Sequence, residues 1–357
     1  MIKELGSDFW QEKSAVQKNL LCNFPEEFEK RFVLSGRTAQ EFIVRDIINS
    51  RGSFSVYMPS YCCHTMIEPF VKNEVYIEFY GVFAGERGLN FEYDRSNTCD
   101  VVFLMNYFGF TDSDYDKRII EAKRDKKIVI IDRTHAFLLP LTQAEKQADY
   151  IFMSPRKWMF ANAAIACKKG RFFEEDFTRC NERYLFLRNT AAYNKYDYIF
   201  NNHGRKSVFL KQYSEAEELL SVDCERYSAD VDSVERLLHF DATSAEKRRR
   251  SNAEIIVEFL SNFQTDAIRP IFPDVKENDV PLFFPVLLKD GVRDELRSYL
   301  ISKSVYCPVH WPLSDFHKIN DRGRRIYANE LSLICDQRYD DSDILRETEE
   351  IKRFFER

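Results

Sequence analysis

Between about residue 31 and residue 215, short apolar runs rich in β-branched residues alternate with amphipathic stretches of helical period. This alternation is typical of parallel strands, because such strands need long connections and crossover helices supply them. The expected strands are 54–58, 75–80, 101–107, 127–132 and 150–154, and the expected helices of this region include 38–50 and 114–125. The sequence therefore predicts an α/β fold with a mostly parallel central sheet.

Beyond about residue 215 the pattern changes to helices followed by short strands. We expect helices at 214–221, 231–238, 244–263 and 341–355, and strands near 280–288 and 304–308. This order predicts a smaller C-terminal α+β domain. We place the boundary near residue 230, which gives a large domain of residues 1–230 and a small domain of residues 231–357. The N-terminal residues 1–30 can add to the small domain.

Composition and charge exclude several classes of protein. Of the 357 residues, 44% are hydrophobic and 31% are charged, a balance that favours a globular fold over disorder. The net charge is −6, and the one basic run, 247–250, lies on a predicted helix as a solvated face, so we expect no nucleic-acid partner. No stretch approaches the roughly 20 apolar residues that span a bilayer. The nine cysteines show no zinc spacing and no signal peptide precedes them, so we expect a cytoplasmic protein without a metal site.

Two adjacent cysteines, Cys62 and Cys63, precede His64. A thiol beside a histidine can be an activated nucleophile. However, neighbours on an extended segment point to opposite faces, so we favour a structural role for this pair of thiols.

Polar residues follow the predicted strands at the edge where parallel sheets bind ligands. The segments 61–64, 132–135 and 154–157 each come at or just after a predicted strand, and 35–38 opens the first predicted helix. Together they offer what pyridoxal 5'-phosphate (PLP) demands. The cofactor needs a lysine for an imine, an acid for the pyridine nitrogen, donors for the phosphate and a flat group against the ring.

Asp132 is the candidate acid, because it ends the apolar run 128–131 and partial burial beside a pyridinium favours an ion pair. His135 lies three residues on and can reach the phenolic oxygen or the ring face of the cofactor. The alternatives are that Asp132 is a helix cap and that His135 is a histidine satisfied within the core.

Lys157 is the candidate for the imine. It lies between the apolar runs 150–153 and 158–160, which would desolvate its amine and lower the pKa toward the neutral form. Ser154 can donate its hydroxyl to the phosphate, as can the 36–38 turn at a helix N-terminus. The alternatives are a surface lysine, a simple Ser-Pro turn and an ordinary N-cap.

Taken in order, these segments resemble the DegT/DnrJ/StrS family of PLP-dependent sugar aminotransferases. The resemblance extends over most of the chain. Its motifs are Ser35-Gly-Arg-Thr-Ala39, Met58-Pro-Ser-Tyr-Cys62, Asn106-Tyr-Phe-Gly109, Ile131-Asp-Arg-Thr-His135, Ser154-Pro-Arg-Lys-Trp158, the helix from Arg248 to Leu260, and Cys307-Pro-Val-His-Trp-Pro312.

The resemblance implies a three-layer PLP-dependent transferase fold of type I and a role for each site residue. Lys157 would be the Schiff-base lysine and proton shuttle, Asp132 would pair with the pyridine nitrogen, and His135 would lie near the phenolic oxygen. Phosphate contacts would come from Gly36, Arg37, Thr38 and Ser154. The ring would lie under the segment 61–64. The family's aromatic stacking position aligns with Cys63, so His64 or Tyr61 would substitute for it.

The family also implies a homodimer with shared active sites. The partner's phosphate contact would be Asn201, Asn202 or Ser228, and His310 and Trp311 would line the substrate site. This chain departs from the family after the lysine, where 160–165 replaces a glycine-rich turn, and at Arg133 and Thr134.

The expected activity is transfer of an amino group, with glutamate as a donor, to a keto sugar that is nucleotide-linked and destined for a surface polysaccharide or related glycan. Two alternatives remain, a dehydratase-like PLP reaction and a PLP-fold protein without turnover. Lys157 argues against the first, because relatives that dehydrate sugars carry histidine there. A Rossmann dinucleotide enzyme is disfavoured, because no Gly-x-Gly-x-x-Gly follows a strand.

Overall fold

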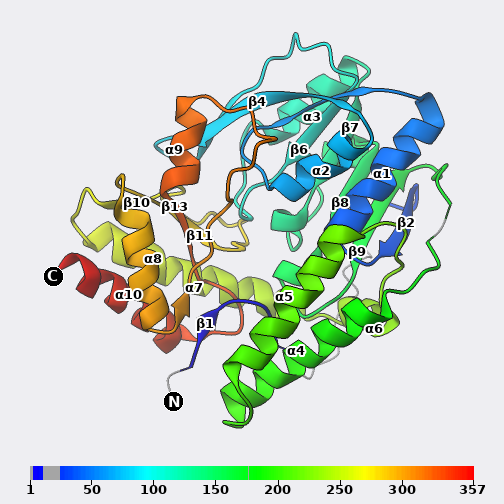
Figure 1. The fold of residues 1–357 in the computed structure, drawn as a ribbon. Coiled ribbons are helices and arrows are strands. Elements are labelled where there is room, and N and C mark those ends of the chain that lie inside the picture. The colour runs from blue at the N-terminus through cyan, green and yellow to red at the C-terminus, as the bar shows by residue number, and fades with distance from the viewer. Residues whose placement is uncertain (1–2, 11–24, 176) are drawn as a thin grey trace.

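A central sheet of eight strands, in the order β2-β9-β8-β7-β6-β3-β4-β5, organises the larger part of the molecule (Figure 1). The computed structural model describes residues 3–10, 25–175 and 177–357. The strands are β2 (Phe28–Val33), β3 (Ser55–Pro59), β4 (Tyr76–Ala84), β5 (Leu89–Glu92), β6 (Val101–Met105), β7 (Ile128–Asp132), β8 (Tyr150–Met153) and β9 (Ala164–Lys169).

The pairings from β8 through β7, β6 and β3 to β4 are all parallel, which confirms the mostly parallel sheet. All five predicted strands are present, within a few residues at their ends. The sequence did not predict β2, β5 and β9, which add to the sheet in antiparallel fashion. Charged side chains interrupt β2 and end β9, so neither has the uninterrupted apolar run of a central strand.

Three helices flank this sheet: α1 (Gly36–Arg51), α2 (His64–Lys72) and α3 (Tyr115–Arg124). The Ser35 hydroxyl caps α1 by accepting the N–H of Thr38, and the buried face of the helix packs against β8 and β9. Helix α3 packs against β7. The N-terminus of α1 therefore lies over the part of the sheet that carries the predicted site.

A helical hairpin follows the sheet, made of α4 (Glu182–Phe200) and α5 (Lys206–Val222) (Figure 1). The sequence did not predict α4, and it placed only the second half of α5. Helix α4 has aromatic side chains around much of its circumference, and several are exposed, so the helical period is hidden.

The remaining elements form a three-stranded antiparallel sheet with helices around it, as expected for the α+β part. They are α6 (Val231–Leu238), α7 (Ala242–Asn262), β10 (Ile268–Pro270), β11 (Phe284–Leu288), α8 (Val292–Ser302), β12 (Val305–Tyr306), α9 (Asp321–Asn329), β13 (Glu330–Leu333) and α10 (Asp341–Phe355). Strand β1 (Leu5–Gly6) pairs in parallel with β12 (Figure 1). The exact boundary near residue 230 stays a prediction.

The sheet register places the site. Asp132 at the end of β7 is level with Met105 on one side and with Phe152 on the other. The residues that follow β7 and β8 therefore emerge at the same edge. Within the described residues, no helix is both long and apolar enough to cross a membrane.

Candidate active site

A pocket of about 210 Å³ opens at the carboxyl ends of the parallel strands, below the N-terminus of α1. It collects most of the residues that the sequence predicted for the cofactor or substrate: Gly36, Arg37, Cys63, Asp132, His135, Ser154, Lys157 and Trp311. These residues come from α1, from the start of α2, from the ends of β7 and β8, and from the loop after β12.

Asp132 is 3% exposed, and its Oδ1 accepts the Thr134 N–H at 2.7 Å. Burial raises the pKa of its carboxyl to about 6, against the lowering effect of Thr134 and of the Lys157 ammonium. A carboxylate in this position is stabilised by a cationic partner. A pyridinium nitrogen has the required charge and hydrogen-bonding character.

Lys157 ends a single 3-10 turn, Pro155–Lys157, that follows β8. Its Nζ lies 5.9 Å from the ring centre of Trp311. Burial lowers the pKa of the amine, as the apolar flanks of this lysine predicted, although Cys63 and Asp132 favour the charged form. A larger share of neutral amine is therefore present at neutral pH than for a surface lysine.

His135 is buried, and its Nδ1 accepts the Phe108 N–H at 3.3 Å. Burial and the nearby Lys157 and His310 hold the pKa of the imidazole well below its usual range. The ring is therefore neutral, and because Nδ1 is an acceptor, the proton is on Nε2. This leaves His135 with one N–H to donate. Its ring stacks on that of Trp311, with centroids 5.4 Å apart.

Helix α1 approaches the turn after β8 closely at Gly36. A Cβ at Gly36 would lie 3.2 Å from the Ser154 Cβ, so only glycine lets the two segments meet without displacement. The Ser154 hydroxyl lies beside this contact, the N–H groups of Gly36 and Arg37 begin the helix there, and Arg37, whose Nη1 donates to the Ser221 hydroxyl at 3.0 Å, also lines the pocket. That donor set fits a phosphate, which favours a helix N-terminus.

Three of the residues predicted to bind the cofactor do not line the pocket. The Thr38 hydroxyl donates to the Cys224 carbonyl oxygen at 2.7 Å, so it serves the packing of α1. Tyr61 is fully buried behind Trp311, with ring centres 5.1 Å apart. His64 lies at the start of α2, with Nε2 3.7 Å from Glu68 Oε1.

The expectation that Cys63 and His64 point apart is wrong. Cys63 is extended, but helix α2 begins at His64, so the chain turns there and Cys63 Sγ lies 3.9 Å from His64 Nδ1. The Thr65 hydroxyl also donates to this sulfur, at 3.1 Å. Burial alone would raise the pKa of the Cys63 thiol, but the contacts with His64 and Thr65 outweigh burial and lower it.

Of the pair expected on the substrate side, Trp311 lines the pocket and His310 lies behind it. His310 Nδ1 is 2.9 Å from the Ser332 hydroxyl, and its backbone N–H donates to Glu330 at 2.7 Å. Sequence reasoning had not assigned the remaining lining residues to the site: Ser35, Gln40, Thr65, Met66, Met105, Thr134, Phe152, Arg156 and Leu220. Of these, Ser35, Thr134 and Arg156 lie inside the recognised motifs, which is the one signal that could have found them.

The residues proposed to reach a partner subunit lie apart from the pocket of their own chain. Asn201 caps the C-terminus of α4, Asn202 follows it, and both are exposed. The Ser228 hydroxyl donates to the Arg179 carbonyl oxygen at 3.0 Å. Their role toward a second subunit stays a prediction.

Comparison with known proteins places this geometry in a common fold. No family model and no curated protein matches the sequence. Among solved structures, Helicobacter pylori PseC, an aminotransferase of pseudoaminic acid biosynthesis, is similar with a TM-score of 0.65 at 11% identity, covering 99% of this chain and 100% of that one. Bacillus subtilis NtdA, solved with the bound cofactor PMP, has a TM-score of 0.61 at 13% identity, covering 92% of this chain and 73% of that one.

A DegT/DnrJ/EryC1/StrS aminotransferase from Brucella abortus has a TM-score of 0.60 at 13% identity, covering 91% of this chain and 86% of that one. At such low identity the likeness establishes the fold. The three-layer fold predicted from the motifs is therefore confirmed over nearly the whole chain.

Proposed function

We propose that this chain is a PLP-dependent aminotransferase of the DegT/DnrJ/StrS type. The observation that carries the proposal is the meeting, in one pocket, of a partly buried lysine, a buried carboxylate and a glycine-lined helix N-terminus. Each fits a different part of PLP, and the sequence spacing of all three resembles that family. The similar structures of PseC, named as an aminotransferase, and of NtdA, solved with bound PMP, add support.

The residues have distinct tasks in holding the cofactor. Lys157 would bond covalently to it, Asp132 would keep its ring nitrogen protonated, and Gly36, Arg37 and Ser154 would hold its phosphate. When bound, PLP supplies an electron sink for the carbon that gains or loses the amino group. Trp311 and His135 offer the flat faces in the pocket, which Cys63 cannot.

Proton transfer would fall to Lys157, because its neutral form can take a proton at Nζ and return it. The Trp311 ring near Nζ stabilises the ammonium once it forms. His135 would donate its Nε2 proton as a hydrogen bond without changing charge, since its pKa is far below neutrality. Packing of Trp311 and Tyr61 excludes water from this side of the pocket.

We propose that the substrates are an amino acid donor such as glutamate and a keto sugar acceptor. The acceptor would be tested as a nucleotide-linked sugar. It is supported by the family resemblance and by the sugar pathway named for PseC. The alternative of a fold without turnover is an outcome of the test below.

Absorbance provides that test. Purified protein mixed with PLP should gain a band near the visible edge, and borohydride reduction should fix the cofactor on the peptide that carries Lys157. Lys157→Ala should lose both, whereas Lys169→Ala, an exposed lysine on β9, should keep both. Glutamate should then shift the band toward that of pyridoxamine phosphate. Retention of the band in Lys157→Ala would overturn the assignment, and binding without any response to amino donors would favour a non-catalytic protein.

We further propose a twofold homodimer that buries one face of α4. Phe186, Tyr193 and Phe200 lie seven residues apart on that helix and are 67%, 56% and 46% exposed. Such an apolar stripe is unusual for a free surface. Light scattering should give twice the mass of the chain, and Phe186→Asp with Tyr193→Asp should give the monomer.

A further inference from the structure

Helix α7 carries a cation in the interior of the protein. The Arg249 side chain is fully buried, and burial lowers the pKa of its guanidinium to about 10. Within the described residues, no carboxylate forms an ion pair with it. Asp336 favours the charged form without forming an ion pair, and burying a charge in this way is costly, so its retention calls for an explanation.

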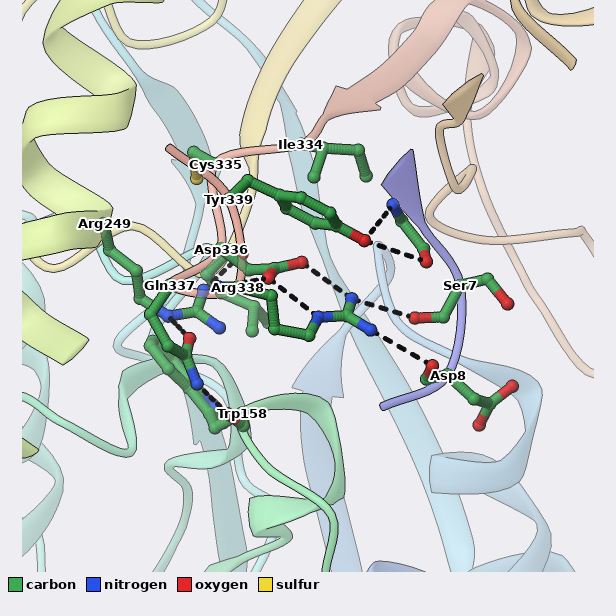
Figure 2. Close-up of polar contacts among 12 residues, drawn as sticks. Ser7, Asp8, Trp158, Arg249, Ile334, Cys335, Asp336, Gln337, Arg338 and Tyr339 are labelled. Atoms are coloured by element: carbon green, nitrogen blue, oxygen red, sulfur yellow. Dashed lines mark hydrogen bonds and ion pairs between the residues drawn. The ribbon is translucent and has the colours of Figure 1, made fainter. Parts of the chain in front are cut away.

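The Arg249 guanidinium packs on Trp158, the residue after the candidate cofactor lysine, and its Nε is bonded to Gln337 (Figure 2). Nη1 donates to the carbonyl oxygens of Pro281 and Leu282, and the guanidinium lies over the Trp158 ring at 4.3 Å from its centre. Nε donates at 2.7 Å to Gln337 Oε1, whose amide donates in turn at 2.6 Å to the Trp158 carbonyl oxygen. The Arg249 side chain therefore holds the indole of Trp158, and the Gln337 side chain holds its backbone.

Trp158 connects this cluster to both chemical groups of the site. Its indole Nε1 donates to the Thr134 carbonyl oxygen at 2.7 Å, and its backbone N–H donates to Pro155 at the same distance. Thr134 in turn donates its N–H to Asp132 and accepts the Ser154 N–H at 3.2 Å. A displacement of Trp158 would therefore disturb the Lys157 turn and the Asp132 loop together.

Gln337 is held in a stiff segment. Arg338 forms a buried ion pair with Asp336 at 2.8 Å and donates to the carbonyl oxygens of Ser7 and Asp8, at 3.1 Å each (Figure 2). The Tyr339 hydroxyl accepts the Gly6 N–H at 2.9 Å. Because its neighbours are fixed on both sides, Gln337 can set the position of Trp158 rather than follow it.

We propose that Arg249 and Gln337 are positioning residues that, through Trp158, hold the Lys157 amine in its desolvated place beside Asp132. The inference rests on the proposed function only for the identity of Lys157 as the cofactor lysine. An apolar side chain could pack on an indole without the cost of a buried charge. What Arg249 adds is a set of directional bonds to the backbone and to Gln337.

The reactivity of the Lys157 amine reports on its position. Charged or titratable groups that act on Nζ come from several elements: Cys63, Asp132, His135, Arg156, His310 and Glu330. Desolvation is the largest influence among them. If the turn loosens, water reaches the amine and its pKa rises toward that of a free lysine.

The test is competitive labelling of the cofactor-free protein with trace acetic anhydride over a range of pH, read by mass spectrometry at Lys157. In Arg249→Met and Gln337→Leu the apparent pKa should rise by about one unit, so the labelling rate at a fixed pH below it falls about tenfold. Arg249→Lys should restore little, because lysine lacks the fork that serves the indole and three acceptors. Arg248→Met is the matched control, since Arg248 is a half-exposed neighbour on α7 that pairs with Asp341.

A structural role alone would lower the melting temperature of the variants without moving the labelling profile of Lys157, and that result would overturn the proposal. If Arg249→Met does not fold, Gln337→Leu decides the matter alone. PLP capture by the same proteins is measured separately. If the wild-type protein captures no PLP while the two variants still show the labelling shift, the proposed function is refuted and the positioning role remains.

Discussion

Asp132 is the group whose replacement tests the electrostatics of the pocket most sharply. Burial raises the pKa of its carboxyl from 3.8 to about 6. The native state then binds the proton more tightly than the unfolded chain, so folding stability falls as the pH rises between these two values. The difference is about 2.2 units (6 minus 3.8), and at about 1.36 kcal/mol per unit this amounts to about 3 kcal/mol.

Asp132→Asn removes the titration and keeps an oxygen that can accept the Thr134 N–H. Without cofactor, the variant should be more stable than the wild type by up to about 3 kcal/mol at about pH 8, and the gain should vanish below about pH 4. Urea unfolding followed by circular dichroism across this pH range measures the difference. Asp125→Asn is the control, because that exposed carboxyl has a lowered pKa through Arg95, so its replacement should give no gain.

Two results would refute the reasoning about Asp132: equal stability of variant and wild type at about pH 8, or a gain that does not shrink on acidification. With PLP bound, the difference in stability between Asp132→Asn and the wild type should reverse its sign. The amide cannot compensate a pyridinium, so the more stable variant should bind the cofactor more weakly.

Two further predictions concern the pocket walls. Gly36→Ala would place a Cβ 3.2 Å from the Ser154 Cβ and so displace α1. We expect the affinity for PLP, measured by fluorescence titration, to fall about tenfold, while the melting temperature of the cofactor-free protein changes little. An unchanged affinity would contradict the phosphate assignment. The pKa of the Cys63 thiol is lowered and that of the Cys180 thiol is raised. At about pH 7, iodoacetamide should therefore modify Cys63 at least as fast as the more exposed Cys180, and PLP should protect Cys63 alone. Faster labelling of Cys180 would argue against a thiolate at Cys63.

The central features of the fold were predictable because they depend on local patterns. The apolar runs that became β7 and β8 end at Asp132 and just before Ser154, and a parallel sheet must bring such ends together. The last helix, Asp341–Phe355, was predicted to the residue, since a capping box at Asp340 marks its start.

The failures have equally local causes. Helix α2 contains Pro69, which argues against a helix, so the Cys63–His64 contact was misjudged. The position of Trp158 depends on Gln337, which is 179 residues distant in sequence. It also depends on the basic run 247–250, which was interpreted as a solvated face. Of that run, Arg249 faces inward while Arg248 is half-exposed, a distinction that only the packing of α7 decides.

Three ionisable groups of the pocket lie where their charged forms are disfavoured. Burial raises the pKa of Asp132 and lowers those of Lys157 and His135, so all three are driven toward neutrality in the absence of a ligand. A stable core would not collect such groups, because well-packed apolar residues would cost less. Their presence together is therefore best explained by a ligand that carries the complementary charges. A cationic ring nitrogen would offset the cost at Asp132, and a phosphate at the N-terminus of α1 would offset the cationic character of Arg37 and the helix dipole. The same argument implies that ligand binding should stabilise this fold more than the number of new contacts alone would indicate.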